Sequence, residues 1–370
     1  MKTRIFSTIL LRLTAALMAL CLLPVFAFAE TAETTDPAET AESAETLTVA
    51  DLPDWITFLL ICNEGMNNDK GNAGNTLMVV SMNPIVGKIR LMMFTWDTFI
   101  DYEGYDVPQK LDMPYRNNGA EEAMKVFNAN FGLDIQYYMS LNYLNLASLI
   151  DDYGGVTVDV SRAERNALNG MVASKKTQLQ REAGTGLLSQ AVLEMLAQDY
   201  YLSNFGPETH LNGLQAVGFG WLQYDSVYNC CEREVEVIAS LFESVGKYVA
   251  DRVVFYTNES GAPDSADARR AINLDAVTEE DYTFLRQQMD PIFQMAFHNL
   301  NEDEIRSLSL ALAHVGYMAS RQGVDIFDHL DHMVLPLEAK DPYDIVAGAK
   351  GHLVDKEANT KAIEDFLFQD

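Results

Sequence analysis

Histidine is the side chain that most often binds metals or moves protons, and this sequence offers only one close pair of them. His329 and His332 lie three residues apart in a segment expected to be helical, with Asp328 and Asp331 beside them. Such a group could hold a metal ion at the surface, since imidazole and carboxylate are both zinc ligands. An exposed polar face is the interpretation that the pattern favours.

Cysteine chemistry is equally sparse. Apart from Cys21 in an apolar N-terminal run, the cysteines are Cys62, Cys230 and Cys231, an odd number without zinc-type spacing. Buried structural thiols are favoured, although one bridge could form in an oxidising exterior if Cys62 and Cys230 meet in space. The G-x-S-x-G, H-E-x-x-H, P-loop and G-x-G-x-x-G motifs are absent as well. The widely shared catalytic signatures therefore do not explain this chain.

The N-terminus has the pattern of a secretory signal. Lys2 and Arg4 precede an apolar run that ends in Ala27-Phe28-Ala29, the small-x-small pattern that signal peptidases cut. The run is shorter than the roughly 20 residues that span a bilayer, so cleavage is favoured over an uncleaved anchor. We predict a signal peptide over 1–29 and an extracytoplasmic protein, secreted or associated with the cell envelope. Residues 30–53 form an acidic Thr/Ala/Glu stretch with few large apolar side chains, which predicts a disordered linker.

The charge balance limits the partners. The chain has 26 Lys and Arg against 54 Asp and Glu, a formal net charge of -28. This excludes nucleic acid as an expected partner, because nucleic-acid-binding domains present basic surfaces. Anionic lipids would also be repelled unless a local cationic patch or a divalent metal intervenes.

The hydropathy pattern predicts a layered α/β fold. Apolar, β-prone runs are centred on residues 55–61, 77–82, 89–95, 137–141, 156–160 and 216–224, and helical periodicity covers 119–131, 143–153, 187–201 and 231–248. Turn residues between the second and third runs indicate an antiparallel hairpin. We predict a core over 54–250 and a C-terminal helical extension over 251–370, with helices near 279–300, 303–320 and 353–368.

Several segments resemble one family in the same order. They are Asn75-Thr76-Leu77-Met78-Val79-Val80-Ser81-Met82-Asn83-Pro84, Asp97-Thr98-Phe99, Ile135-Gln136-Tyr137-Tyr138, Gly154-Gly155-Val156-Thr157-Val158-Asp159-Val160 and His210-Leu211-Asn212-Gly213-Leu214-Gln215-Ala216. This chain is similar to the LytR-CpsA-Psr family over roughly 55–368. The resemblance implies a three-layer α-β-α domain with a central mixed sheet. It also implies attachment of glycopolymers from polyprenyl-pyrophosphate carriers to the cell wall, at the outer face of the cytoplasmic membrane.

The residues that would do this chemistry in the family are largely replaced. Family arginines hold the pyrophosphate, and the resemblance places Trp96, Trp221, Gln223 and Cys230 at four of their positions. Asn75 stands where the family has a metal-binding aspartate. Charge-assisted hydrogen bonds contribute about 1.5–3 kcal/mol each, so four losses could remove on the order of 6–12 kcal/mol of phosphate stabilisation.

The surviving polar residues define the candidate site. Asp97 and Arg233 are the candidate catalytic residues, with Glu64 and Lys110 in the pocket. Asp97 and Asn75 are the candidate ligands for Mg²⁺, which prefers carboxylate and amide oxygens. A turn carboxylate at Asp97, and an Arg233 paired with Glu236 or Asp225, are the alternatives.

Two functions follow from these replacements. The first is a non-catalytic envelope protein that binds a lipid-linked glycan or wall polymer, or assists active relatives. In that case Trp96 and Trp221 would make the pocket apolar and suited to a polyprenyl tail, or would simply fill it. The second is an active Mg²⁺-dependent phosphotransferase that acts on polyprenyl-pyrophosphate-linked glycans.

Overall fold

A computed structural model describes residues 52–65, 72–183, 201–320 and 329–368 of the chain. All of them belong to one compact unit, Ala44–Asp370. The predicted signal peptide, nearly all of the predicted linker and nearly all of the helix expected at 187–201 lie outside the described residues.

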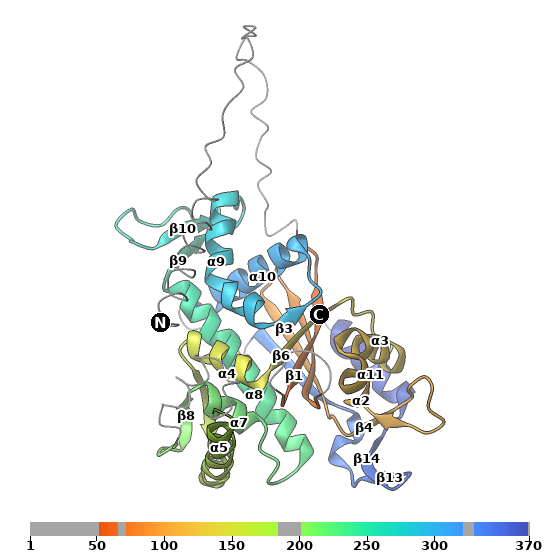
Figure 1. The fold of residues 1–370 in the computed structure, drawn as a ribbon. Helices are drawn as coiled ribbons and strands as arrows, with labels where there is room; N and C mark the ends of the chain where they lie inside the picture. Colours follow the sequence, from red (N-terminus) through yellow and green to blue (C-terminus); the bar gives the residue numbers. More distant parts are fainter. Residues whose placement is uncertain (1–51, 66–71, 184–200, 321–328, 369–370) are drawn as a thin grey trace, which may run out of the picture. The chain divides into compact units, whose positions relative to one another are not determined.

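A six-stranded mixed sheet forms the centre of the unit (Figure 1), in the strand order β11-β6-β1-β2-β3-β12. Its strands are β1 (Ile56–Asn63), β2 (Gly74–Asn83), β3 (Lys88–Phe94), β6 (Tyr137–Asn142), β11 (Phe297–His298) and β12 (Leu330–Leu335). The expected hairpin is present, because β2 and β3 pair antiparallel from Leu77 opposite Phe94 to Asn83 opposite Lys88. The Asn83 side chain closes the turn by accepting the backbone N–H groups of Ile85 and Val86.

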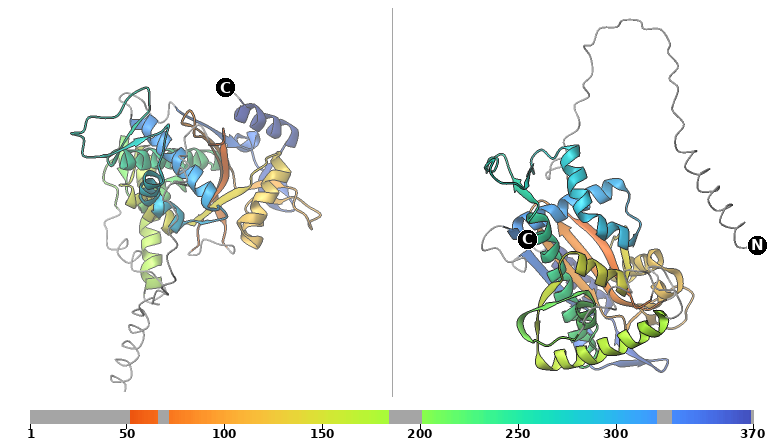
Figure 2. Two further views of the ribbon diagram at one scale, coloured as in Figure 1. Left: turned by 90° about the horizontal axis from the view of Figure 1, so that it is seen from above. Right: turned by 60° about the vertical axis from the view of Figure 1, so that its left-hand side comes forward.

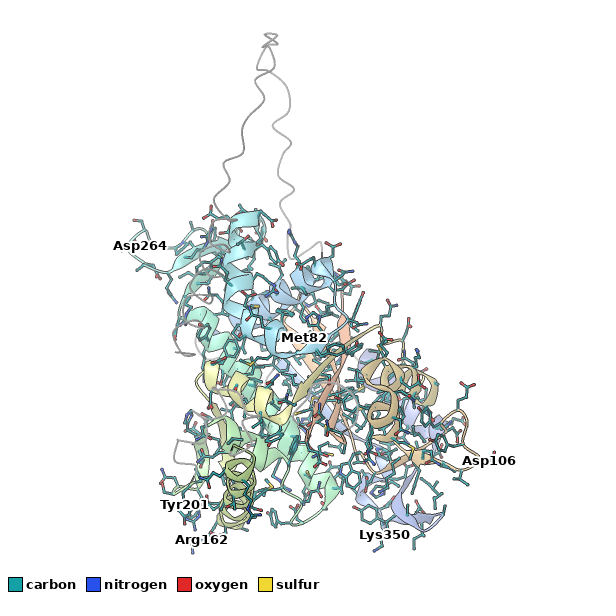
Figure 3. All side chains as sticks on the ribbon, viewed as in Figure 1. Met82, Asp106, Arg162, Tyr201, Asp264 and Lys350 are labelled. Atoms are coloured by element: carbon teal, nitrogen blue, oxygen red, sulfur yellow. The ribbon has the colours of Figure 1, made fainter. Side chains whose placement is uncertain are left out.

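Both faces of the sheet are buried, which makes the fold three-layered. Alternate residues of β2 enter different cores. Leu77 and Val79 pack toward α3 (Ala120–Phe131) and α11 (Lys356–Phe368), whereas Met82 (labelled in Figure 3) packs toward α4 (Tyr143–Asp152), α8 (Val227–Ala250) and α10 (Glu302–Ser320). Figure 2 shows these two helical layers on opposite sides of the strands. The α/β class with a central mixed sheet is therefore confirmed.

The remaining elements surround this sheet. The helices are α2 (Met113–Asn118), α3 (Ala120–Phe131), α4 (Tyr143–Asp152), α5 (Arg162–Ala183), α7 (Gly213–Gly220), α8 (Val227–Ala250), α9 (Glu279–Met295), α10 (Glu302–Ser320), η3 (Leu337–Lys340) and α11 (Lys356–Phe368). The other strands are β4 (Thr98–Ile100), β5 (Gln109–Lys110), β7 (Val156–Val160), β8 (Gly206–Leu211), β9 (Val253–Tyr256), β10 (Arg270–Asn273), β13 (Asp344–Val346) and β14 (Ala349–Leu353). None of the described helices is long and apolar enough to span a bilayer.

The strand expected at 216–224 is wrong, because residues 216–220 belong to helix α7 and residues 221–224 follow it outside any strand. The Asn212 side-chain oxygen caps the helix by accepting the backbone N–H of Gln215. The Gln215 side-chain oxygen in turn accepts the backbone N–H of Asn212. This capping box starts a helix in an apolar run that periodicity alone could not distinguish from a strand. A Cβ at Gly213 would lie 1.8 Å from the Ala147 carbonyl oxygen, so glycine lets α7 approach α4.

The C-terminal part contributes strands as well as helices. β12 pairs parallel with β3 at the edge of the central sheet. The helix expected to carry both His329 and His332 is therefore wrong, because His332 lies on β12 and His329 immediately precedes this strand. The short hairpin β13–β14 joins β4 through a parallel pairing of His352 with Thr98.

Candidate functional site

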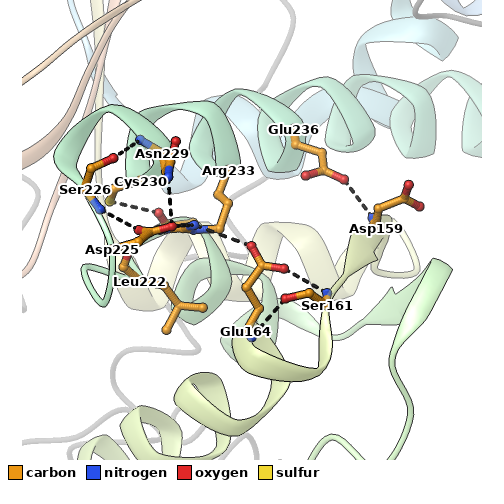
Figure 4. Close-up of polar contacts among 11 residues, drawn as sticks. Asp159, Ser161, Glu164, Leu222, Asp225, Ser226, Asn229, Cys230, Arg233 and Glu236 are labelled. Atoms are coloured by element: carbon orange, nitrogen blue, oxygen red, sulfur yellow. Dashed lines mark hydrogen bonds and ion pairs between the residues drawn. The ribbon is translucent and has the colours of Figure 1, made fainter. Parts of the chain in front are cut away.

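Arg233 lies on α8 and is buried, with 5% of its surface exposed. Its guanidinium donates from Nη2 and Nη1 to the two carboxylate oxygens of Asp225 at 2.8 and 3.0 Å (Figure 4). Nη1 also reaches Glu164 at 3.4 Å, and Nη2 donates to the Leu222 carbonyl oxygen. The predicted pairing with Asp225 is confirmed, whereas Glu236 accepts the Asp159 N–H instead.

These hydrogen bonds compensate the positive charge of Arg233, which stays protonated. Its hydrogen bond lowers the pKa of Asp225 to about 2, so this carboxylate stays ionised at neutral pH. Burial alone would lower the pKa of Arg233, but the bonds to Asp225 outweigh it and raise that pKa. One positive charge thus faces two carboxylates, and the group as a whole is negative.

The hollow beside Arg233 is acidic. It has a volume of about 560 Å³, and its lining includes the carboxylates Glu164, Asp225, Glu232 and Glu236. His332 lies against Glu232, with Nε2 2.9 Å from Oε2. The hydrogen bond to Glu232 raises the pKa of His332. An anion entering this hollow would meet more negative than positive charge.

Next to Arg233, α8 also carries a buried polar cluster, which we name the Glu234 cluster. It consists of Cys62, Thr76, Trp221, Cys230 and Glu234. The Trp221 indole N–H donates to Thr76 Oγ1 at 3.3 Å. The Cys230 thiol donates to the Gly220 carbonyl oxygen at 3.2 Å and lies 3.7 Å from Glu234 Oε1. Of the positions that the resemblance assigns to arginines, 230 therefore contacts the Glu234 carboxyl group directly and 221 is linked to it through Thr76.

Burial controls ionisation in the Glu234 cluster. It raises the pKa of Glu234 to about 8, against the opposing hydrogen bonds of Thr76 and Cys230. The carboxyl group is thus mostly protonated at pH 7. Burial also raises the pKa values of the Cys62 and Cys230 thiols, with Glu234 adding to the shift. The thiols are free and neutral, so this part of the site carries little charge.

Asp97 is also buried and follows β3 at the same end of the sheet. Its Oδ1 has no hydrogen-bond partner. Tyr343 lies against it: burial, the charge of Asp97 and a hydrogen bond to that carboxylate raise the pKa of Tyr343 to about 12. The Tyr343 ring lies 4.9 Å from the His352 ring, and the His352 N–H faces the Asp97 carbonyl oxygen at 3.4 Å. The hairpin β13–β14 thus covers the Asp97 loop.

The other predicted site residues are spread around these groups. Lys110 lies over the Trp96 ring, with Nζ 4.6 Å from the ring centre, so its ammonium group makes a cation–π contact with the indole. Asn75 is half-buried on β2 next to Thr76, whereas Glu64 and Gln223 are exposed. The structure therefore places Cys230 and Trp221 in the Glu234 cluster, and Arg233 lies close enough for its charge to act on Cys230 and Glu234.

Three comparisons relate this chain to known proteins. The model of the LytR_cpsA_psr family matches residues 23–245, more than half of the chain. This chain belongs to the LytR-CpsA-Psr family. Within the family it is similar to polyisoprenyl-teichoic acid–peptidoglycan teichoic acid transferases named TagU. The Enterococcus faecalis protein is 29% identical over 85 residues, and the Bacillus mycoides protein is 24% identical over 104 residues.

These matches are partial. They cover 23% and 28% of this chain and span only 28% and 34% of the two relatives. Among solved structures, B. subtilis TagV has a TM-score of 0.54 at 13% identity, covering 86% of this chain and 98% of that one. TagT bound to LI-WTA also has a TM-score of 0.54, at 11% identity, covering 89% of this chain and 97% of that one. This similarity establishes the fold of a LytR-CpsA-Psr domain.

The Mg²⁺ that the family implies does not fit the residues around Asp97. Mg²⁺ binds through oxygen ligands in octahedral geometry. Among the described residues, the groups that interact with Asp97 include the Tyr343 phenol and the buried Cys231 thiol, which are not the carboxylate and amide oxygens that Mg²⁺ prefers. The described residues contain no group of three or more His, Cys, Asp or Glu side chains that could hold a metal. No reaction step is therefore assigned to Mg²⁺ here.

Four residues at this LytR-CpsA-Psr site were not expected from the sequence. Glu234 could have been found, because it directly follows the candidate residue Arg233. Glu164, Tyr343 and His352 come from α5 and from the C-terminal hairpin, and no local motif marks them. Their role depends on contacts that span at least 69 residues of sequence.

Proposed function

We propose that this member of the LytR-CpsA-Psr family is a non-catalytic envelope protein that binds a lipid-linked glycan or wall polymer, or assists an active relative. The observation that carries the proposal is the pairing of Arg233 with Asp225 and Glu164. Phosphoryl transfer depends on positive charges held around the phosphates. Here Arg233, the one arginine that the resemblance retains, already bonds two carboxylates. Positions 221 and 230, which the resemblance assigns to arginines, are occupied by Trp221 and Cys230 of the Glu234 cluster.

The size of the electrostatic penalty supports the absence of catalysis. Two unit charges 4 Å apart interact by about 4 kcal/mol at an effective dielectric constant of 20. A diphosphate beside Arg233 would gain that attraction once and meet repulsion from Asp225 and Glu164. Each 1.36 kcal/mol lost from transition-state binding slows a reaction about tenfold. The arrangement therefore disfavours diphosphate chemistry by several powers of ten.

Binding of a lipid tail is supported by an apolar cavity below α8. The cavity has a volume of about 70 Å³, and side chains from the sheet and from α4, α8, α9 and α10 line it, including Leu146, Leu241 and Leu312. Its wall is almost entirely apolar, which suits hydrocarbon. Because about 70 Å³ is well below the roughly 300–1,000 Å³ of ligand pockets, the helices would have to separate before an isoprenoid tail could enter.

The TagU relatives support a wall polymer as the ligand class, because their names describe transfer of teichoic acid to peptidoglycan. We extend that polymer class, and an extracytoplasmic location reached through the predicted signal peptide, to this chain. The alternative, an active Mg²⁺-dependent phosphotransferase, is favoured by one observation. Asp97 Oδ1 is buried without a hydrogen-bond partner, so this carboxylate retains one acceptor although its neighbours do not form a Mg²⁺ site.

The test is to incubate the purified protein with Mg²⁺ and a polyprenyl-pyrophosphate-linked saccharide and to measure both binding and release of polyprenyl phosphate. Bacillus mycoides TagU serves as the positive control. We expect saturable binding without turnover. Turnover that disappears in both Asp97→Ala and Arg233→Ala would establish the alternative and overturn the proposal.

A further inference from the structure

A second hollow lies at the far end of the central sheet. It has a volume of about 410 Å³ and is formed by the start of β1, the start of β6 and the first turn of α10. β1 and β6 are parallel, with Phe58 opposite Tyr137, so both strands begin at this end. The Glu234 cluster lies at the other end of β1, where Cys62 pairs with Thr76, and Asp97 follows β3 at that same end. An eight-residue strand separates the two sites by about 25 Å.

Two aromatic rings at this hollow are held in place. The guanidinium of buried Arg90 lies 4.4 Å from the centre of the Trp55 ring, so a cation supports one side of the indole. The Tyr137 hydroxyl donates to Glu304 Oε1 at 2.9 Å, and Glu304 Oε2 accepts the Asn301 N–H at 2.7 Å. Both rings are half-buried. The positions of both rings are therefore fixed, and part of each ring remains exposed to contact a ligand.

The polar groups around these rings are mostly acceptors. Asp134, Gln136 and Asp303 are exposed at the rim. The full lining is Pro53, Trp55, Ile56, Thr57, Asp134, Gln136, Tyr137, Asp303, Glu304 and Ser307. These residues include three carboxylates and neither lysine nor arginine. An anionic ligand would be repelled here, whereas a ligand rich in hydroxyl donors would find partners.

We propose that this hollow binds a short, uncharged oligosaccharide. Sugar rings present C–H faces that pack on aromatic side chains, and hydroxyl groups that donate to carboxylate and amide oxygens. Rings and acceptors of this kind occur together here, and the volume falls within the roughly 300–1,000 Å³ of ligand pockets. The site lies away from Asp97 and Arg233, so the inference does not depend on the proposed function.

The test is calorimetric titration of the full protein with N,N′-diacetylchitobiose, a neutral disaccharide, and with a digalacturonate as its anionic counterpart. Trp55→Leu removes the indole surface, and we expect about tenfold weaker binding, the scale of one lost aromatic contact. The double variant Gln136→Ala/Asp303→Ala changes only exposed rim positions, and we expect a comparable loss. Asp264→Ala, an exposed carboxylate on the β9–β10 connection (Figure 3), is the matched control.

Saturable binding of the neutral disaccharide that both variants weaken and Asp264→Ala leaves unchanged would support the site. If Trp55→Leu fails to fold, the rim double variant alone decides. Absence of saturable binding, equal binding of the digalacturonate, or binding that the rim variant leaves intact would each overturn the inference. A failure here leaves polyprenyl-saccharide binding at the other end of the sheet untouched, so the two proposals can fail separately.

Discussion

Substitution of Glu234 by glutamine should change how stability depends on pH. Glu234 is 5% exposed, and its pKa rises from an ordinary 4.5 to about 8 in the folded protein. Folding therefore favours the protonated carboxyl group. The associated stability is fully present below pH 4.5 and is lost as the pH rises through 8, because the unfolded chain then releases the proton more readily.

The expected size follows from about 1.36 kcal/mol per pKa unit. Between pH 5 and pH 8, Glu234 should reduce the free energy of unfolding by roughly 3–4 kcal/mol. Glu234→Gln has nearly the same shape and does not titrate, so it lacks this loss. The variant should match the parent protein near pH 5 and exceed it by about 2–4 kcal/mol at pH 8, less whatever the second amide hydrogen costs without a partner.

Urea denaturation of both proteins at pH 5, 6, 7 and 8 measures this difference, and all other titrating groups cancel in the comparison. Glu232→Gln is the control, because the hydrogen bond to His332 lowers the pKa of Glu232. The control should show no gain at high pH. Parallel stability curves for Glu234→Gln and the parent would mean that Glu234 is ionised in the folded protein, and the reasoning about the Glu234 cluster would be wrong.

Three further outcomes are expected. Asp225→Ala leaves buried Arg233 without its main partner and should lower the free energy of unfolding by about 2–4 kcal/mol in urea, whereas an unchanged midpoint would show that the pair contributes nothing. Gly213→Ala places a Cβ 1.8 Å from the Ala147 carbonyl oxygen and should lower the melting temperature by several degrees or prevent folding. The three buried cysteines should not react with a thiol reagent at pH 8 until urea is added, since burial raises their pKa values, and rapid labelling of the native protein would contradict this.

Local pattern was sufficient for the first three strands of the central sheet, whereas the long helix α5 was not predicted. The apolar runs that became β1, β2 and β3 are buried on both faces, and the turn at Asn83 fixes their hairpin. Pattern failed at α7, where a capping box decides between helix and strand, and at β12. β12 forms a strand because its backbone pairs with the edge of β3, which is distant in sequence.

In the candidate site, too, local sequence indicates some contacts, whereas others arise only from the tertiary fold. The pairing of Arg233 with Asp225 was foreseeable, because eight residues separate them at the start of one helix. Glu164 and Tyr343 reach the site from other elements, so only tertiary structure reveals them. The resemblance identified positions 221 and 230 as altered, but it could not show that a protonated carboxyl group occupies the space beside them.

The pairing of β12 with β3 has a consequence for how the chain is made. About 240 residues separate Ile89 from its partner Leu330, so the apolar edge of β3 has no neighbour until almost the entire polypeptide has emerged. Exposed strand edges promote aggregation, and contacts this distant in sequence form slowly. A product cut short before residue 330 would present that bare edge to its surroundings. The last tenth of the chain, which supplies β12, is thus required to cover the edge of β3 and complete the central sheet.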